Sequence, residues 1–145
     1  MKKIKKVFIE GAIPSAFIGQ SIAKHQSKTA IGAHEIFLGQ IRADVVEDKQ
    51  ITAIEYTANI EMAERLLHEL RESTFEQFDI ICMHIHHSLG MVGVGELCFF
   101  VFVSSKHRSE ARKACAYIVD HIKKEIPIFG KEIFEDHSHQ WKVNT

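Results

Sequence analysis

The sequence predicts one α+β domain spanning residues 1–145 and built on a mostly antiparallel sheet. A chain of 145 residues matches one ordinary domain, because two domains would each have too little core. With 46% hydrophobic and 26% charged residues, the composition is that of a globular chain and not of a disordered one. Segments with strand character occur in pairs between helical segments, which favours antiparallel neighbours over a doubly wound parallel sheet.

Strand character begins at residues 4–9 and continues in residues 32–42, where two sets of side chains alternate, and in residues 51–57, which are rich in β-branched residues. Residues 96–104 are apolar on both faces, which predicts a central strand. The other strands are expected at residues 79–86, 131–134 and 140–143. Between two of these strands lie Gly90, Gly93 and Gly95. Their spacing does not fit a dinucleotide-binding loop and no helix follows, so we expect a hairpin turn there.

Helical periodicity is found in three segments. Residues 15–25 begin at Ser15, which can cap a helix. The apolar stripe of residues 59–76 consists of Met62, Ala63, Leu66, Leu67 and Leu70. That of residues 106–125 consists of Ala111, Ala114, Cys115, Ile118 and Ile122, and Pro127 ends this helix.

The charge balance excludes some classes of partner. Eighteen Lys and Arg against nineteen Asp and Glu give a net charge of −1, which argues against a non-specific nucleic-acid binder. No apolar run has the length of a membrane span, and we expect no membrane partner. Three cysteines, an odd number with no CxxC pair, suit a reducing compartment, so we expect a cytoplasmic protein.

Ten histidines are an unusual number for this length, and two of them suggest a metal. Cys82, His84 and His86 occupy alternate positions of one expected strand and therefore face the same side. Such a set could hold a transition metal. The alternative is that this face packs on a helix and each histidine is hydrogen bonded. No fourth ligand lies nearby in the sequence, so the reading without a metal site is preferred.

A cluster of basic residues occurs where a buried strand meets the third helix. Lys106, His107 and Arg108 occupy the first turn, although the amino end of a helix is already partly positive. An anion such as phosphate, bound between these side chains and the free backbone N–H groups, would explain the arrangement. A solvated turn in which Glu110 balances the charge explains it equally well.

Two further cations stand at the ends of expected elements. Lys123 follows the stripe residue Ile122, and a lysine at the edge of a core can be partly desolvated and so become useful in proton transfer. Arg42 ends a hydrophobic strand, where its guanidinium can be directed at a phosphate or a carboxylate.

A series of short stretches recurs in order along the chain at the spacing of a known family. They include Phe37-Leu38-Gly39-Gln40-Ile41-Arg42, Ile54-Glu55-Tyr56, Ser104-Ser105-Lys106-His107-Arg108, Ile122-Lys123, Pro127-Ile128-Phe129, Lys131-Glu132 and Trp141. From about Gly32 to Trp141 the chain thereby resembles the large, catalytic subunit of molybdopterin synthase. One such stretch would be a weak signal, whereas all of them in order are specific.

The resemblance implies an α/β hammerhead fold and a homodimer within a heterotetramer. Each copy would bind a small ubiquitin-like sulfur-carrier subunit, whose C-terminal Gly-Gly thiocarboxylate enters a pocket. There sulfur would pass to cyclic pyranopterin monophosphate, and two transfers would make the dithiolene of molybdopterin. The step needs no metal or organic cofactor.

The resemblance also implies the site. Its substrate-binding residues would be Gln40, Ile41, Arg42, His107, Arg108, Lys123, Gly130, Lys131 and Glu132, with Lys123 and Lys131 as the catalytic lysines. Two positions depart from the family pattern. Gly130 stands where a second functional lysine usually lies, and Lys131 could replace it only if the backbone shifts, because on a strand it points to the other face. His87 stands where the family often has an arginine.

A second class of function is compatible with the same residues. A non-catalytic α+β module could bind a phosphorylated ligand or a protein tail without carrying out chemistry, and the missing lysine at Gly130 gives this alternative some weight.

Overall fold

The computed structural model describes residues 6–143, and in these the chain forms eight strands and three helices. In chain order these are β1 (Phe8–Glu10), α1 (Ser15–His25), β2 (Ala33–Gln40), β3 (Val45–Val46), β4 (Lys49–Ala58), α2 (Ile60–Gln77), β5 (Cys82–Gly93), β6 (Leu97–Ser105), α3 (Arg108–Glu125), β7 (Ile128–Phe134) and β8 (His139–Trp141). The start of the strand predicted at residues 4–9 lies outside the described residues.

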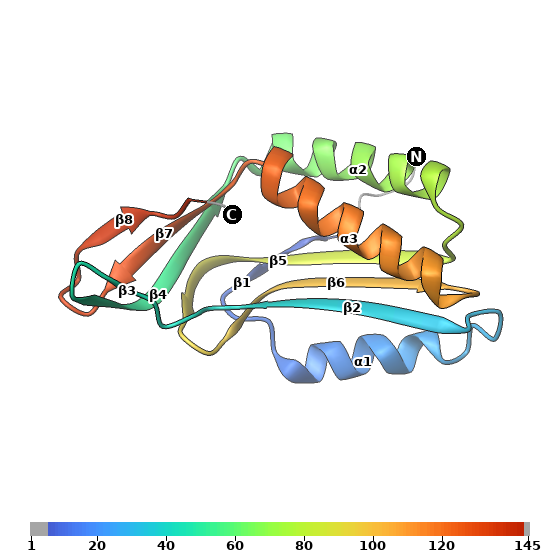
Figure 1. Ribbon diagram of the computed structural model, residues 1–145, viewed down its shortest axis with the longest axis horizontal. Coiled ribbons are helices and arrows are strands. Elements are labelled where there is room, and N and C mark those ends of the chain that lie inside the picture. The colour runs from blue at the N-terminus through green and yellow to red at the C-terminus, as the bar shows by residue number, and fades with distance from the viewer. Residues whose placement is uncertain (1–5, 144–145) are drawn as a thin grey trace.

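The long strands β2, β6 and β5 form a sheet that is covered on both faces (Figure 1). Helices α2 and α3 lie on one face and α1 on the other. Pairing is antiparallel from β2 to β6 and from β6 to β5, and the short β1 pairs parallel to β5. The prediction of an α+β fold with a mostly antiparallel sheet is therefore confirmed.

Strand β6 lies between β2 and β5, as its apolar sequence predicted. Phe100 and Phe102 face α1, whereas Val101 and Val103 belong to the core beneath α2 and α3, and all four are fully buried. A strand buried on both faces cannot show polar alternation, which is the physical reason for its continuous apolar run.

Strand β5 bends and so belongs to both parts of the sheet. Its first half pairs with β6, and its last residues pair with β4, for example Val92 with Ile54. The bend lies at Gly90, whose φ is +80°, a value that glycine adopts without steric strain. The hairpin turn predicted within residues 90–95 is confirmed, but it is shorter than that segment, because β5 continues to Gly93 and the turn lies at Val94 and Gly95.

The second part of the sheet contains β3, β4, β7 and β8 and projects beyond the helices (Figure 1). Tyr56 of β4 faces Gly130 of β7 across the ladder. Strand β3 was not predicted, because a two-residue strand held by a tight turn has no periodicity of its own.

Helices α2 and α3 each bury an apolar stripe, and the structure corrects two details of the predicted helices. Helix α3 buries all five predicted stripe residues. In α2, Met62 is 42% exposed, and the buried set is Ala63, Leu67, Leu70 and Thr74, so the real stripe is rotated relative to the predicted one. In α1 the capping position is Pro14 and not Ser15. Over the described residues, each helix falls short of the length or the apolar character that a membrane crossing demands.

Candidate functional site

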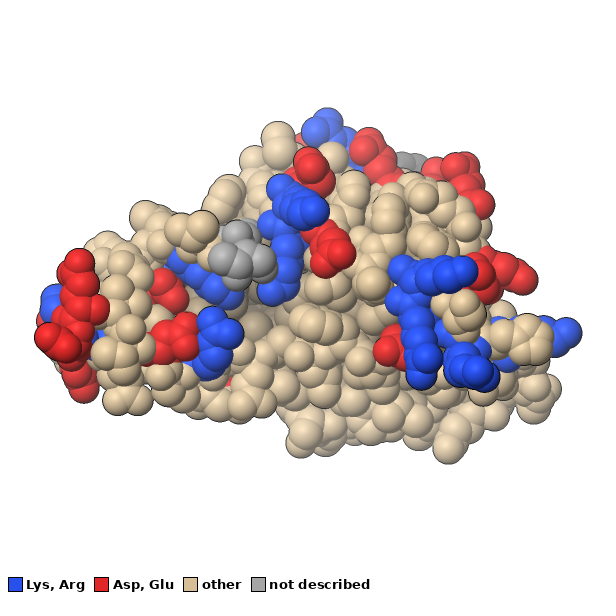
Figure 2. Space-filling view, viewed as in Figure 1, with Lys and Arg blue, Asp and Glu red and all other residues tan. Residues whose placement is uncertain are grey.

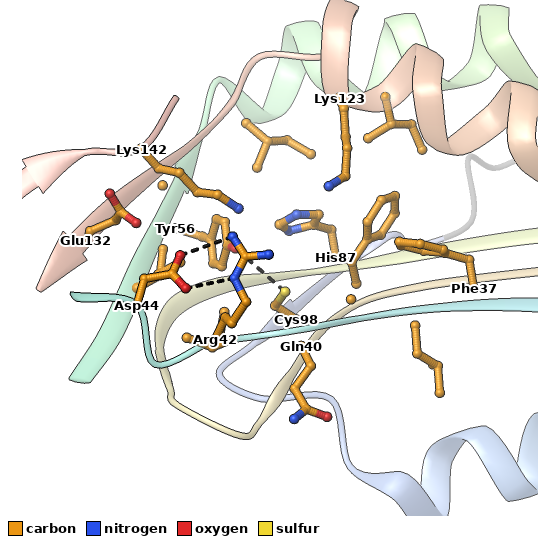
Figure 3. A pocket seen from close by; sticks show the side chains of 18 residues that line it. Phe37, Gln40, Arg42, Asp44, Tyr56, His87, Cys98, Lys123, Glu132 and Lys142 are labelled. Carbon is orange, nitrogen blue, oxygen red and sulfur yellow. Dashed lines mark hydrogen bonds and ion pairs between the residues drawn. The ribbon is translucent and has the colours of Figure 1, made fainter. Parts of the chain in front are cut away.

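A cavity of about 300 Å³ opens where the two parts of the sheet meet, beneath the carboxyl end of α3 (Figure 3). Its walls come from the end of β2, from β4, β5, β6, β7 and α3, and from the residue that follows β8. Figure 2 shows Lys and Arg side chains gathered around the hollow at this junction. The lining residues that carry polar groups are Gln40, Arg42, Asp44, Tyr56, His87, Cys98, Lys123, Glu132 and Lys142.

Three cations from separate elements converge on the cavity. Arg42 follows β2, Lys123 lies in the last turn of α3, and Lys142 follows β8. Lys123 and Lys142 are half-buried, and Figure 3 shows the side chains of both directed into the cavity. Two acids, Asp44 and Glu132, also line it. Three cations against two carboxylates leave an excess of one positive charge, so a site of this composition suits an anionic ligand.

Arg42 is held by a carboxylate at the mouth of the cavity. Its Nε donates to Asp44 Oδ1 at 2.8 Å, and a terminal nitrogen donates to Asp44 Oδ2 at 3.0 Å. These hydrogen bonds hold the pKa of Asp44 below its usual value. Because the Arg42 side chain is 81% exposed, this ion pair contributes little stability, and an anion can compete for the guanidinium.

The floor of the cavity contains a buried tyrosine and a buried thiol. The Tyr56 hydroxyl donates to Cys98 Sγ at 3.6 Å. Burial raises the pKa of both groups, so both are neutral near pH 7. A protonated thiol is a poor nucleophile, which agrees with the interpretation of Cys98 as a core cysteine.

His87 is a neutral imidazole in the wall. It is buried, and its ring stands edge-on to that of Tyr56 with 4.8 Å between the ring centroids. Burial lowers the pKa of His87 to about 4. Its Nδ1–H donates to the Ser88 carbonyl oxygen at 2.8 Å, which leaves the lone pair on Nε2. His87 therefore offers the cavity a hydrogen-bond acceptor, where an arginine would offer charge.

Lys131 is not in the cavity. It faces Glu55 across the β4–β7 ladder and its Nζ lies 3.2 Å from Glu55 Oε1, on the face opposite to the cavity. The alternation of a strand explains this, since Gly130 and Glu132 line the cavity and the residue between them cannot. The backbone shift that would bring Lys131 into the site has not occurred.

Lys142 enters the cavity beside Gly130. Its backbone N–H donates to the Gly130 carbonyl oxygen at 2.8 Å. A Cβ at Gly130 would lie 3.0 Å from Ile54 Cγ2 and 3.2 Å from Tyr56 Cε1, so the Tyr56 ring covers the place of a side chain. A lysine that follows the next strand, β8, thus occupies the region that position 130 leaves without charge.

The remaining predicted residues divide into two groups. Gln40, Ile41, Gly130 and Glu132 line the cavity with Arg42 and Lys123. His107 and Arg108, at the other end of α3, do not. Arg108 and Lys123 lie fifteen positions apart on this helix, roughly 22 Å along its axis. One copy of the chain cannot bring both ends of α3 to the same small ligand.

Sequence reasoning missed Asp44, Tyr56, Cys98 and Lys142 as cavity residues. Asp44 lies two residues after Arg42, and that spacing was an available signal for an arginine–carboxylate pair. Lys142 had no local signal, because its place depends on the pairing of β8 with β7.

Comparison with known proteins assigns the family. The MoaE protein family matches residues 15–125 of this chain. The chain belongs to this family. The molybdopterin synthase catalytic subunit of Pyrococcus abyssi is 36% identical over 110 residues, which are 76% of this chain and 74% of that protein. The human molybdopterin synthase catalytic subunit is 34% identical over 113 residues, which are 78% of this chain and 59% of that protein. The resemblance found in the sequence is confirmed.

Solved structures give the same result for the fold. The crystal structure of molybdopterin synthase from Staphylococcus aureus has a TM-score of 0.81 at 27% identity and covers 94% of this chain and 95% of that one. A chain in the complex of subunits 1 and 2 of the molybdopterin-converting factor from Helicobacter pylori has a TM-score of 0.79. At 18% identity, that likeness concerns the fold alone.

Proposed function

We propose that this MoaE-family chain is the catalytic subunit of molybdopterin synthase. It would transfer sulfur from the C-terminal thiocarboxylate of a small ubiquitin-like carrier to cyclic pyranopterin monophosphate, and so build the dithiolene of molybdopterin. The observation that carries this proposal is the convergence of Arg42, Lys123 and Lys142 on one cavity. The reaction brings together an anionic substrate and an anionic carrier tail, and each needs cations.

Substrate binding falls to the mouth and the wall of the cavity. The Arg42 guanidinium can exchange its Asp44 partner for a phosphate, because both offer paired oxygens to its fork. Gln40 and Glu132 can hydrogen bond the polar edge of a pterin, and His87 Nε2 offers an acceptor deeper in the wall. A volume of about 300 Å³ lies within the range of small-molecule sites.

Lys123 is assigned to the thiocarboxylate. It lies half-buried in the last turn of α3 and lines the cavity over His87 and Cys98 (Figure 3). An ammonium in this position can stabilise negative charge that develops on sulfur or oxygen, or can donate a proton to it. Lys142 takes the place of the second catalytic lysine, which the family resemblance had assigned to Lys131, because Lys142 reaches the cavity and Lys131 does not.

His107 and Arg108 are assigned to the neighbouring site of a homodimer. They cannot reach the cavity of their own chain, yet they belong to the stretch that the family resemblance marks as substrate-binding. A second copy that presents the amino end of its α3 would complete the cation set. Two such copies with two carriers form the heterotetramer. A cytoplasmic location remains a prediction, which the three unpaired cysteines favour.

The proposal is tested by mixing the chain with thiocarboxylated carrier and cyclic pyranopterin monophosphate and measuring the molybdopterin formed. Lys123→Ala should lower the rate at least about 100-fold, as expected when one group that stabilises charge is removed. Lys124→Ala is the matched control, because Lys124 is the next residue of the same helical turn, is exposed, and lies outside the cavity lining.

Two results would contradict the assignment. A wild-type chain that binds the carrier tail or the pterin and forms no product would support the non-catalytic binding module instead. Full activity of Lys123→Ala would refute the role of this lysine while leaving the family assignment unchanged.

A further inference from the structure

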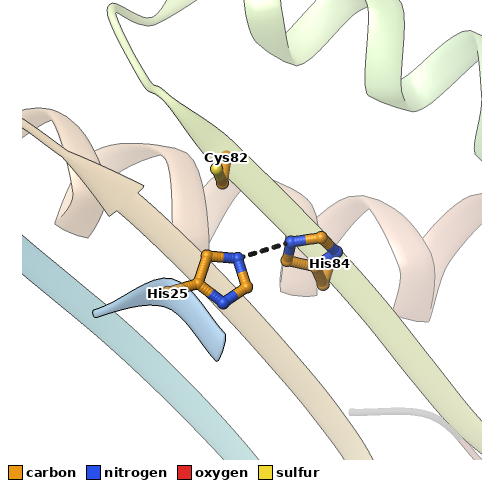
Figure 4. Close-up of side chains that lie close together, drawn as sticks. All are labelled: His25, Cys82 and His84. Atoms are coloured by element: carbon orange, nitrogen blue, oxygen red, sulfur yellow. Dashed lines mark hydrogen bonds between the residues drawn. The ribbon is translucent and has the colours of Figure 1, made fainter. Parts of the chain in front are cut away.

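Three side chains that can ligate a metal lie together on the α1 face of the sheet, away from the cavity (Figure 4). His25 is the last residue of α1, and Cys82 and His84 stand at alternate positions where β5 begins. One ligand atom from each lies within 4.8 Å of the other two. His25 and Cys82 are buried and His84 is half-buried, so the cluster is enclosed but remains reachable from solvent.

The spacing of these atoms is close to that of a tetrahedral site. Zinc binds histidine nitrogen at about 2.0–2.1 Å and cysteine sulfur at about 2.3 Å, so two ligand atoms of a tetrahedral site lie roughly 3.3–3.7 Å apart. The Nε2 atoms of His25 and His84 are 2.9 Å apart, slightly closer than this, and separations within the cluster extend to 4.8 Å, somewhat wider than this. Rotations of the side chains that move these atoms by about 1 Å would admit the ion.

The surroundings of His25 are those of a metal ligand. Its Nδ1–H donates to the Ser21 carbonyl oxygen at 2.7 Å, which fixes the tautomer and directs the Nε2 lone pair at the cluster. The His25 ring also packs against the Phe102 ring, with 4.8 Å between the ring centroids, so the orientation of the imidazole is restrained. His84 must then carry its proton on Nε2 to hydrogen bond with His25, and coordination would move that proton to Nδ1.

Cys82 already interacts with a cation. Lys28 Nζ donates to Cys82 Sγ at 3.0 Å. Lys28 is exposed and follows α1, so its side chain can turn into solvent. A metal would replace this ammonium as the positive partner of the sulfur, and the thiol proton would be released to solvent.

We propose that His25, Cys82 and His84 bind one zinc ion, or another borderline-soft divalent metal, with water as the fourth ligand. Two nitrogens and one sulfur suit such an ion. The sequence hypothesis had joined Cys82 and His84 to His86. Instead, His86 packs between Phe17 and Phe100 and the third ligand comes from α1. The ion would fasten the end of α1 to the sheet and would take no part in the sulfur-transfer site.

The test uses the full chain without an affinity tag, reduced and freed of metal. Zinc is titrated calorimetrically, and cobalt(II) is titrated as a spectroscopic probe. We expect one ion per chain, a sulfur-to-cobalt charge-transfer band, and the visible absorption of tetrahedral cobalt. Cys82→Ser should remove the charge-transfer band, and His25→Gln should weaken binding at least about 10-fold. Cys115→Ala and His86→Gln are the matched controls and should bind as the wild type does.

X-ray absorption spectroscopy of the wild-type zinc complex needs no variant and should show two imidazole nitrogens and one sulfur. Failure of the wild type to bind a stoichiometric ion would overturn the proposal. A zinc coordination shell without sulfur would also overturn it, as would a His86→Gln variant that binds metal as weakly as His25→Gln does. Sulfur transfer is measured separately, so its failure is distinguishable from failure of the metal site.

Discussion

Individual residues in the cavity differ in how far their neighbours alter them. Arg42 and Asp44 are exposed and exchangeable, whereas His87, Tyr56 and Cys98 are buried and held neutral. Burial disfavours the charged form of each of the three, so the floor carries no charge of its own. The charge of the site therefore resides in the cations and acids around its rim.

The two candidate second lysines can be separated by substitution. Lys142→Ala should lower the rate of sulfur transfer about 10-fold or more, because it removes a cation from the cavity. Lys131→Ala breaks the ion pair with Glu55 on the other face and should change the rate much less. Rates measured with saturating carrier decide between them, and the reverse order would restore the role first predicted for Lys131.

His87 should make the protein less stable in mild acid. Its pKa in the folded protein is about 4, below the ordinary 6.5, so between these values the unfolded chain binds a proton that the folded chain does not. Stability is therefore lost as the pH falls from about 7 towards 4. Protonation of His87 should lower the free energy of unfolding by about 2 kcal/mol between pH 7 and pH 5.

Urea unfolding at the two pH values measures this effect. The loss of unfolding free energy between pH 7 and pH 5 should be about 2 kcal/mol smaller in His87→Gln than in the wild type. His139→Gln, on an exposed strand end, should keep the wild-type loss. If His87→Gln loses as much as the wild type, His87 is not the responsible group.

At the scale of elements, the bend in β5 decides where the cavity forms. The strand pairs with β6 before Gly90 and with β4 after it, so the cavity lies between the two parts of the sheet. Helix α3 then supplies Lys123 from its last turn. The stripe of α3 and the central position of β6 could be predicted because consecutive residues carry them as a periodicity or an apolar run.

Gly90→Ala tests the bend. The positive φ is strained for alanine, so we expect a loss of about 1–3 kcal/mol of unfolding free energy, whereas the new Cβ would only displace the end of the flexible Glu10 side chain. Gly19→Ala is the matched control: Gly19 is an exposed position of helix α1 with open space around a Cβ, and the substitution should stabilise the protein by up to about 1 kcal/mol. Equal effects of the two substitutions in chemical denaturation would show that Gly90 is not needed for the bend.

At the scale of the whole molecule, the cavity of one chain lacks His107 and Arg108, which the family resemblance marks as substrate-binding. Because Arg108 and Lys123 stand at opposite ends of α3, the proposed homodimer would supply the missing pair from a second copy.

Mixing two inactive variants tests this arrangement. Arg108→Ala and Lys123→Ala each damage every site of their own homodimer. In a mixed dimer one site would receive both defects and the other site neither. Equal mixing with subunit exchange should therefore restore about a quarter of the wild-type rate. A mixture that stays as inactive as its components would place Arg108 and Lys123 in the same chain's site, or Arg108 outside the site altogether.

The fold class, the helical stripe of α3, the central strand and the family could be read from the sequence alone, together with Arg42 and Lys123 as residues of one site. These follow from local periodicity and from motifs of consecutive residues. Three features became visible only in the folded chain: Lys142 and not Lys131 reaches the cavity, β5 bends at Gly90, and His25 joins Cys82 and His84. Each of these depends on which distant segments pair and on which face a strand residue points to, and the pairing is set by the packing of the whole chain.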